Sequence, residues 1–125
     1  MIAVIFEVVP ASGRRDRYLD VAASLEDQLV STPGFISVER FQSLANPDKV
    51  LSLSFWESES AVGTWRNTTA HREAQDLGRE SVFADYRLRI ASVVRDYGMR
   101  ERAQAPADSR EYHDTRSPES LGCVP

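Results

Sequence analysis

The segment Tyr86–Tyr97 constrains the fold most, because its alternation predicts a β-strand with apolar side chains on both faces. One face would carry Tyr86, Leu88, Ile90, Ser92 and Val94, and the other Arg87, Arg89, Ala91, Val93 and Arg95. Another predicted strand, Ile2–Val9, is likewise apolar on both faces. One layer of helices covers only one face of a sheet, so these strands need a second cover. The simplest cover is the same face of a second copy, and we therefore expect a homodimer.

The other segments complete the order β-α-β-β-α-α-β. The predicted helices are Arg14–Ser31, Glu59–Trp65 and Ala70 to about Ser81, and the two further strands are Phe35–Ser43 and Lys49–Trp56. We expect Ser12, Ser58 and Thr69 to cap the three helices, because a side-chain hydroxyl can accept a hydrogen bond from a free N–H group. This order predicts the α+β class, with a ferredoxin-like fold built on a four-stranded antiparallel sheet.

The predicted strand Lys49–Trp56 has two unlike faces. Leu51, Leu53 and Phe55 form one face, and Ser52, Ser54 and Trp56 form the other. One side of the sheet is therefore apolar, whereas the other is small and polar until it reaches a tryptophan.

The periodicity stops after Gly98. Residues 99–125 contain few apolar side chains, several prolines and scattered charge, which is typical of a segment without a core of its own. We therefore predict one domain at residues 1–98 and a flexible C-terminal tail or arm at residues 99–125. The arm would become ordered only against something else.

Charge and hydropathy exclude several classes of partner. The net charge of −4 gives no basic surface for nucleic acid, and no apolar run approaches the roughly 18 residues that a bilayer requires. The N-terminal segment is apolar but lacks the basic residues of a signal peptide. The single cysteine, Cys123, cannot form an internal disulfide. These features predict a soluble, cytoplasmic protein that binds neither nucleic acid nor membrane.

Aromatic and polar side chains concentrate around the break between the two short helices. The break would turn Trp65, Asn67 and His71 toward the sheet. The alternative to a functional role is that Trp65 simply fills the core and that His71 makes a local hydrogen bond in its helix. The two histidines, His71 and His113, lie far apart in the chain, and no metal-ligand cluster, catalytic triad or phosphate-binding glycine loop is apparent.

The runs WESESA, WRNTTAHREAQ and GRESVFADYRLRIASVVRDYG resemble the antibiotic biosynthesis monooxygenase (ABM) family over residues 1 to about 98. The resemblance implies a dimeric α+β barrel. It also implies one of several activities: cofactor-independent oxygenation of aromatic quinols and anthrones, heme degradation, or a role not yet assigned. Heme-degrading members have a tryptophan where this chain has Trp65, but their histidine and asparagine positions are occupied by Gln75 and Glu7. His71 lies one helical turn before the heme-ligand position.

The leading hypothesis is a cofactor-independent monooxygenase that acts on a small aromatic, quinol or polyketide-like substrate with dioxygen. The predicted catalytic residues are His71 as base, Asn67 and Trp65, with Asn67 or Arg72 stabilising the substrate oxygen. The predicted substrate-binding residues are Phe6, Trp56, Arg72, Gln75, Phe83 and Tyr86. Two alternatives stay open: a heme-binding or heme-degrading monooxygenase, and a non-oxygenase ligand-binding module or polyketide cyclase or isomerase.

Overall fold

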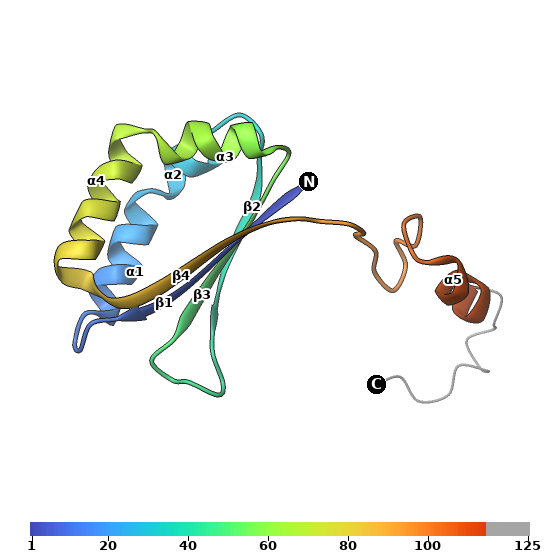
Figure 1. Ribbon diagram of the computed structural model, residues 1–125, viewed down its shortest axis with the longest axis horizontal. Helices are drawn as coiled ribbons and strands as arrows, with labels where there is room; N and C mark the ends of the chain where they lie inside the picture. Colours follow the sequence, from blue (N-terminus) through green and yellow to red (C-terminus); the bar gives the residue numbers. More distant parts are fainter. Residues whose placement is uncertain (115–125) are drawn as a thin grey trace. The chain divides into compact units, whose positions relative to one another are not determined.

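The computed structural model describes residues 1–114, apart from the side chains of residues 69, 70 and 80. The chain forms two compact units, Met1–Ser92 and a second unit from Val93 onward. The first unit is a two-layer α+β domain with its helices on one face of a four-stranded sheet (Figure 1). This arrangement confirms the predicted ferredoxin-like class.

The sheet has the order β2-β3-β1-β4, and every neighbouring pair is antiparallel. Its strands are β1 (Ile2–Pro10), β2 (Phe35–Gln42), β3 (Val50–Trp56) and β4 (Phe83–Ser92). β4 begins and ends earlier than the alternation over Tyr86–Tyr97 predicts. The reason is its partner: Ser92 pairs with Ile2 at the start of β1, so no ladder is available beyond this point.

The predicted helix over Arg14–Ser31 is two helices, α1 (Arg15–Ser24) and α2 (Glu26–Val30). The Ser24 hydroxyl donates to the backbone oxygen of Val21 at 2.6 Å, just before the break at Leu25. Such a local bond competes with helix continuation. The expected N-cap at Ser12 is wrong, since α1 begins after Arg14 without a side-chain cap.

The second helical pair is α3 (Glu59–Arg66) and α4 (Thr69–Leu77), followed by a π-helical turn, η1 (Gly78–Val82). Ser58 caps α3 as predicted, accepting from the Ala61 N–H at 3.2 Å. The cap of α4 is Thr68, not Thr69 as predicted: its hydroxyl accepts from the His71 N–H. The prediction placed the helix end near Ser81, but the π-helical turn replaces its last residues and leads directly into β4.

Two hydrophobic clusters hold the helices on the sheet, one toward each end. The first contains Leu29, Trp56, Ala61, Val62 and Trp65, and the second contains Val8, Tyr18, Val50 and Val82. Burial of apolar surface at both ends stabilises the two layers. The middle of the interface is left to smaller and polar side chains.

The second unit carries a short helix, α5 (Ala107–Asp114), which the sequence pattern did not predict. Arg102 organises it: its guanidinium donates to Asp114 at 2.8 Å and to the Ser109 hydroxyl at 2.8 Å. The same group lies 5.5 Å from the centre of the Tyr97 ring. The rest of the predicted tail, residues 115–125 with Cys123, lies outside the described residues.

Candidate active site

A cavity of about 520 Å³ lies on the helix-covered side of the sheet. Its size is within the range of small-molecule sites. It is lined from both hydrophobic clusters and from the strands between them. The sheet contributes Val4, Phe6, Val38, Arg40, Ser52, Ser54, Trp56, Phe83, Tyr86, Leu88 and Ile90. The space exists because the floor carries small residues where β3 crosses the middle of the sheet.

Two serines on β3 leave space above this part of the sheet, because their side chains are small. Ser52 and Ser54 lie on β3 beside Phe6 and Val4 of β1. The Ser54 hydroxyl accepts the indole N–H of Trp56 at 2.9 Å, and Trp56 is 1% exposed. Trp56, predicted to bind substrate, therefore lines the cavity with its only donor already bonded.

His71 enters the cavity from the first turn of α4, and the Thr68 cap explains its position. The imidazole packs against the Trp65 ring at 5.0 Å between centres, with the rings inclined at 65°. Its Nδ1 atom is buried and has no hydrogen-bond partner among the described residues. A polar atom in this state is available to a ligand.

Burial lowers the pKa of the His71 imidazole below its usual value of 6.5, and the charges of Arg72 and Arg66 lower it further. The imidazole is therefore neutral at pH 7 and can accept a proton. Once protonated it would be destabilised by the same surroundings, which favours passing the proton on. The site thus offers a base beside two fixed positive charges.

Asn67 and Gln75 hold Arg72 by its side chain. One Arg72 nitrogen donates to the Asn67 carbonyl oxygen at 2.7 Å, and the other donates to that of Gln75 at 3.3 Å. Both acceptors are neutral, so the arginine keeps its charge. The Asn67 amide also donates to the Gly63 carbonyl at 2.9 Å. Asn67 itself is not among the residues lining the cavity, so the structure gives it no direct contact with a ligand.

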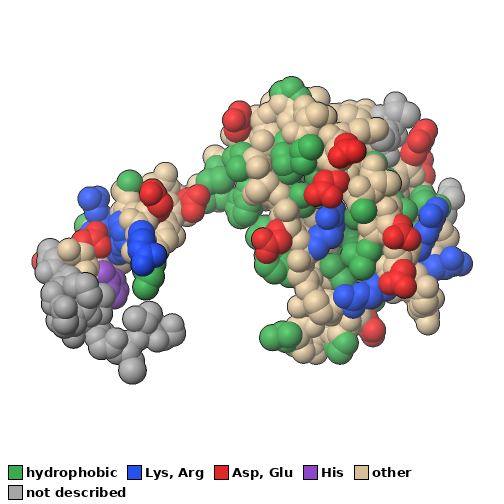
Figure 2. Space-filling model, turned by 180° about the vertical axis from the view of Figure 1, so that it is seen from behind, with side chains coloured by type: hydrophobic (Ala, Val, Ile, Leu, Met, Phe, Trp, Pro, Cys, Tyr) green, Lys and Arg blue, Asp and Glu red, His purple; other side chains and the backbone are tan. Residues whose placement is uncertain are grey.

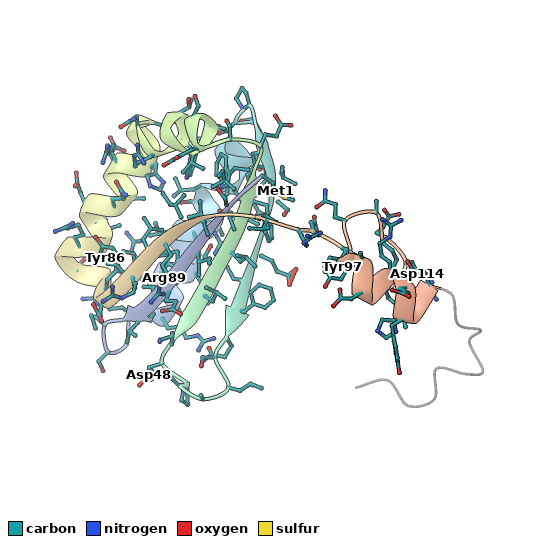
Figure 3. All side chains as sticks on the ribbon, turned by 45° about the vertical axis from the view of Figure 1, so that its right-hand side comes forward. Met1, Asp48, Tyr86, Arg89, Tyr97 and Asp114 are labelled. Carbon is teal, nitrogen blue, oxygen red and sulfur yellow. The ribbon has the colours of Figure 1, made fainter. Side chains whose placement is uncertain are left out.

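Four aromatic rings close the cavity near the π-helical turn. Phe83 lies 5.8–5.9 Å from Phe6, Tyr18 and Tyr86, ring centre to ring centre. Tyr86, labelled in Figure 3 near the start of β4, accepts a hydrogen bond from Arg79 at 3.2 Å. This wall suits the flat face of an aromatic ligand.

Eight of the nine predicted site residues line this cavity; Asn67 is the exception. Sequence reasoning missed Arg40 and Tyr18, which also line it. Arg40 could have been found from its alternation in β2 with Val38, opposite in phase to Glu39 and Phe41. Tyr18 is one of the apolar residues that recur at helical spacing in its segment, and nothing in the sequence distinguished it from a core residue.

The residues present do not match a heme site of the kind that the resemblance implies. Glu7 belongs to the uncovered face of the sheet, where it pairs with Arg89 at 3.3 Å and with Lys49 at 3.9 Å. Gln75 faces the cavity but is bonded to Arg72. Among the side chains that the structure describes, no group of three His, Cys, Asp or Glu residues could hold a metal ion.

The sequence profile of a family described as antibiotic biosynthesis monooxygenase matches residues 1–77. The chain belongs to the ABM family. A relative named "Jasmonate monooxygenase ABM" from Pyricularia oryzae is 41% identical over 115 residues, which cover 91% of this chain and 54% of that protein. The uncharacterized protein YqjZ of Bacillus subtilis is 30% identical over 93 residues, 74% of this chain and 79% of that one.

Solved structures support the ABM fold. A putative antibiotic biosynthesis monooxygenase from Deinococcus radiodurans superposes with a TM-score of 0.71 at 11% identity, covering 79% of this chain and 98% of that one. The chain spans about half the length of the jasmonate monooxygenase. The match to that ABM relative covers 91% of this chain, so it extends past β4 into the second unit.

Proposed function

We propose that this ABM protein is a monooxygenase that works without a bound cofactor on a small aromatic, quinol or polyketide-like substrate. The observation that carries the proposal is His71, a neutral base with a buried, unpartnered Nδ1 atom in a largely apolar cavity. The name of the jasmonate monooxygenase supports oxygen chemistry in the family.

The first step is removal of an acidic proton from the substrate by His71. The negative charge then spreads onto a substrate oxygen, where Arg72 can stabilise it. Its two neutral partners leave its charge intact while limiting its freedom. Pairing of the imidazolium with the substrate anion offsets the cost of charging a partly buried His71.

The electron-rich carbanion then reduces dioxygen directly. With an anthrone, the net reaction is R₂CH₂ + O₂ → R₂C=O + H₂O: two C–H bonds are broken, one oxygen atom enters the carbonyl and the other leaves as water. The substrate supplies all four electrons, so no external reductant is needed. Phe6, Phe83 and Trp65 hold the ring and limit the access of water to the reactive anion.

We further propose that two copies pair through the uncovered face of the sheet. Ile5, Leu51, Leu53 and Phe55 belong to this face, together with Phe41, which is 41% exposed. Figure 2 shows hydrophobic side chains at the surface of the domain between charged ones. Contiguous apolar surface of this kind marks interaction sites, and the likeness of the chain to the ABM family supports a second copy as the occupant.

Leu53→Glu tests the pairing in sedimentation velocity runs. The wild type should sediment as a dimer and Leu53→Glu as a monomer, because the new charge would be buried at the interface. Leu44→Glu is the matched control, since Leu44 is 99% exposed in the β2–β3 loop. A monomeric wild type, or an unchanged Leu53→Glu dimer, contradicts this assignment of the interface.

Oxygen uptake with anthrone tests the chemistry. The wild type should consume one dioxygen per anthrone, and His71→Ala should lower kcat by about 10²–10⁴-fold, the usual contribution of a general base. His113→Ala, which removes a histidine of the second unit, should leave the rate unchanged. Full turnover by His71→Ala would remove His71 from the mechanism.

Two further measurements separate the alternatives. Substrate conversion that proceeds equally well without oxygen would identify a cyclase or isomerase. A Soret shift on addition of heme that disappears in His71→Ala would favour heme binding over the cofactor-free reaction.

A further inference from the structure

Arg40 is a half-buried cation that has no ion-pair partner among the described residues. It lies on β2 and lines the cavity. Its Nε atom is buried and has no hydrogen-bond partner, and no described carboxylate lies within 4.0 Å of its guanidinium. A buried N–H group without a partner is costly, so a ligand that accepts a hydrogen bond from this guanidinium would stabilise the site.

The guanidinium is held beside Tyr18, which is 6% exposed. Burial raises the pKa of the Tyr18 phenol above its usual 10.0, while the charge of Arg40 and a hydrogen bond with it oppose the rise. Tyr18 therefore remains a neutral phenol. It positions Arg40 without cancelling its charge.

A graded row of side chains crosses the floor from Arg40. The strand register places Arg40, Ser52, Phe6 and Leu88 side by side on β2, β3, β1 and β4. The row thus passes from a cation through a hydroxyl to an aromatic ring and an aliphatic chain. With strands about 4.8 Å apart, it is about 14 Å long.

The apolar end of this row is the open end. Leu88 is 46% exposed and its β4 neighbours Tyr86 and Ile90 are each 39% exposed, whereas Nε of Arg40 is buried. A ligand that follows the row would carry its polar group to the guanidinium of Arg40 and its apolar body toward β4.

The cavity lining as a whole is positively charged, like Arg40 itself. Among the described side chains it contains four arginines, Arg40, Arg66, Arg72 and Arg79, against one carboxylate, Asp76. We propose that the substrate is an amphiphilic carboxylic acid whose carboxylate binds Arg40 and whose apolar body lies over Phe6 and Leu88. This proposal rests on the proposed function in taking the cavity as the substrate site.

The chemistry of the two groups supports this assignment. A guanidinium offers parallel N–H donors that match the two oxygens of a carboxylate. Because Nε of Arg40 is buried, such a pair discriminates against a neutral analogue, which would leave the cation unpaired.

Fluorescence titration with two probes tests the proposal without any oxygen chemistry. Anthracene-9-carboxylate and 9-anthracenemethanol share a flat body and differ in charge. The wild type should bind the acid at least ten-fold more tightly than the alcohol. Arg40→Met should bind both with similar affinity, while its Kd for the alcohol changes less than three-fold.

Two more variants complete the design. Arg87→Met is the matched control. Arg87 lies opposite Glu7 in the β1–β4 strand register, on the uncovered face, and does not line the cavity. This variant should keep the ten-fold preference for the acid. Arg40→Lys keeps the positive charge but loses the parallel N–H donors of the guanidinium. Its preference for the acid over the alcohol should therefore be intermediate. Melting temperatures establish that each variant is folded.

Equal affinity of the wild type for acid and alcohol would overturn the proposal, whatever Arg40→Met does. A preference that survives in folded Arg40→Met, or that Arg87→Met also loses, would overturn it as well. These outcomes are separate from oxygen uptake: anthrone oxidation without an acid preference would refute the Arg40 site alone, and an acid preference without oxidation would refute the proposed reaction alone.

Discussion

Replacing Gly34 by alanine should destabilise the domain through two separable effects. Gly34 has φ of +87°, a backbone conformation that costs a residue with a Cβ about 1–2 kcal/mol. An added Cβ would also lie 2.6 Å from the Cβ of Ala61 at the start of α3. Overpacking of this kind costs about 1–3 kcal/mol. The expected loss in the free energy of unfolding is therefore about 2–5 kcal/mol.

Gly13 provides the matched control. Its φ is +75°, but an added Cβ would meet nothing within 4 Å. Gly13→Ala should therefore show only the backbone cost of about 1–2 kcal/mol. Urea unfolding at one fixed protein concentration measures both variants, so that any association affects them equally.

The contact with Ala61 can be tested directly. In an Ala61→Gly background, Gly34→Ala should cost no more than Gly13→Ala does, because the opposing methyl group is gone. If Gly34→Ala and Gly13→Ala cost the same in the wild-type background, within about 0.5 kcal/mol, the reasoning is refuted. The point matters for the site, because Gly34 sets how closely β2 approaches the helix that carries Trp65.

Three further predictions concern the cavity. If His71 is the base, kcat/KM should rise with pH through an inflection below 6.5 and be level at pH 7, since only the neutral imidazole accepts the proton; Arg72→Gln should move that inflection to higher pH, and an inflection above 7 in the wild type would contradict the assignment. Ser54→Ala should lower the free energy of unfolding by about 1–3 kcal/mol, because it leaves the buried Trp56 N–H without an acceptor; a change below about 0.5 kcal/mol in urea unfolding would show that the bond is replaced. Asn67→Ala should lower kcat by a few fold with little change in melting temperature, because it releases Arg72, which stabilises the charge formed during the reaction; an unchanged kcat would show that Arg72 does not need this restraint.

The sequence predicted the parts of the fold that follow from local pattern. Alternation in Val50–Trp56 separates the leucines from the serines, and the structure places the serines on the cavity side. The ends of β4 could not be predicted from the sequence, because a strand ends where its partner ends and that partner is distant in the chain. The break at Leu25 coincides with a hydrogen bond from the Ser24 hydroxyl to Val21, a local signal that the apolar periodicity of the segment conceals.

The candidate site likewise contains residues that could be predicted from the sequence and residues that could not. His71 and Trp65 could be predicted because both adjoin the break between α3 and α4. The alternation of β2 could have placed Arg40 on the cavity side, but not its pairing with Tyr18, since the two belong to different elements and meet only when α1 folds over β2. Asn67 shows the opposite error: its residue type suggested contact with substrate, but its side chain is bonded to Gly63 and Arg72.

The separation of the core into two clusters has a consequence for how the domain can change. The large buried side chains lie toward the two ends of the sheet, whereas the floor between them is formed by Ser52, Ser54 and Phe6. A mutation at Ser52 would therefore reshape the ligand space without removing apolar contacts that hold the layers together. At this position natural variation can therefore alter the substrate range while sparing the contacts that stabilise the domain.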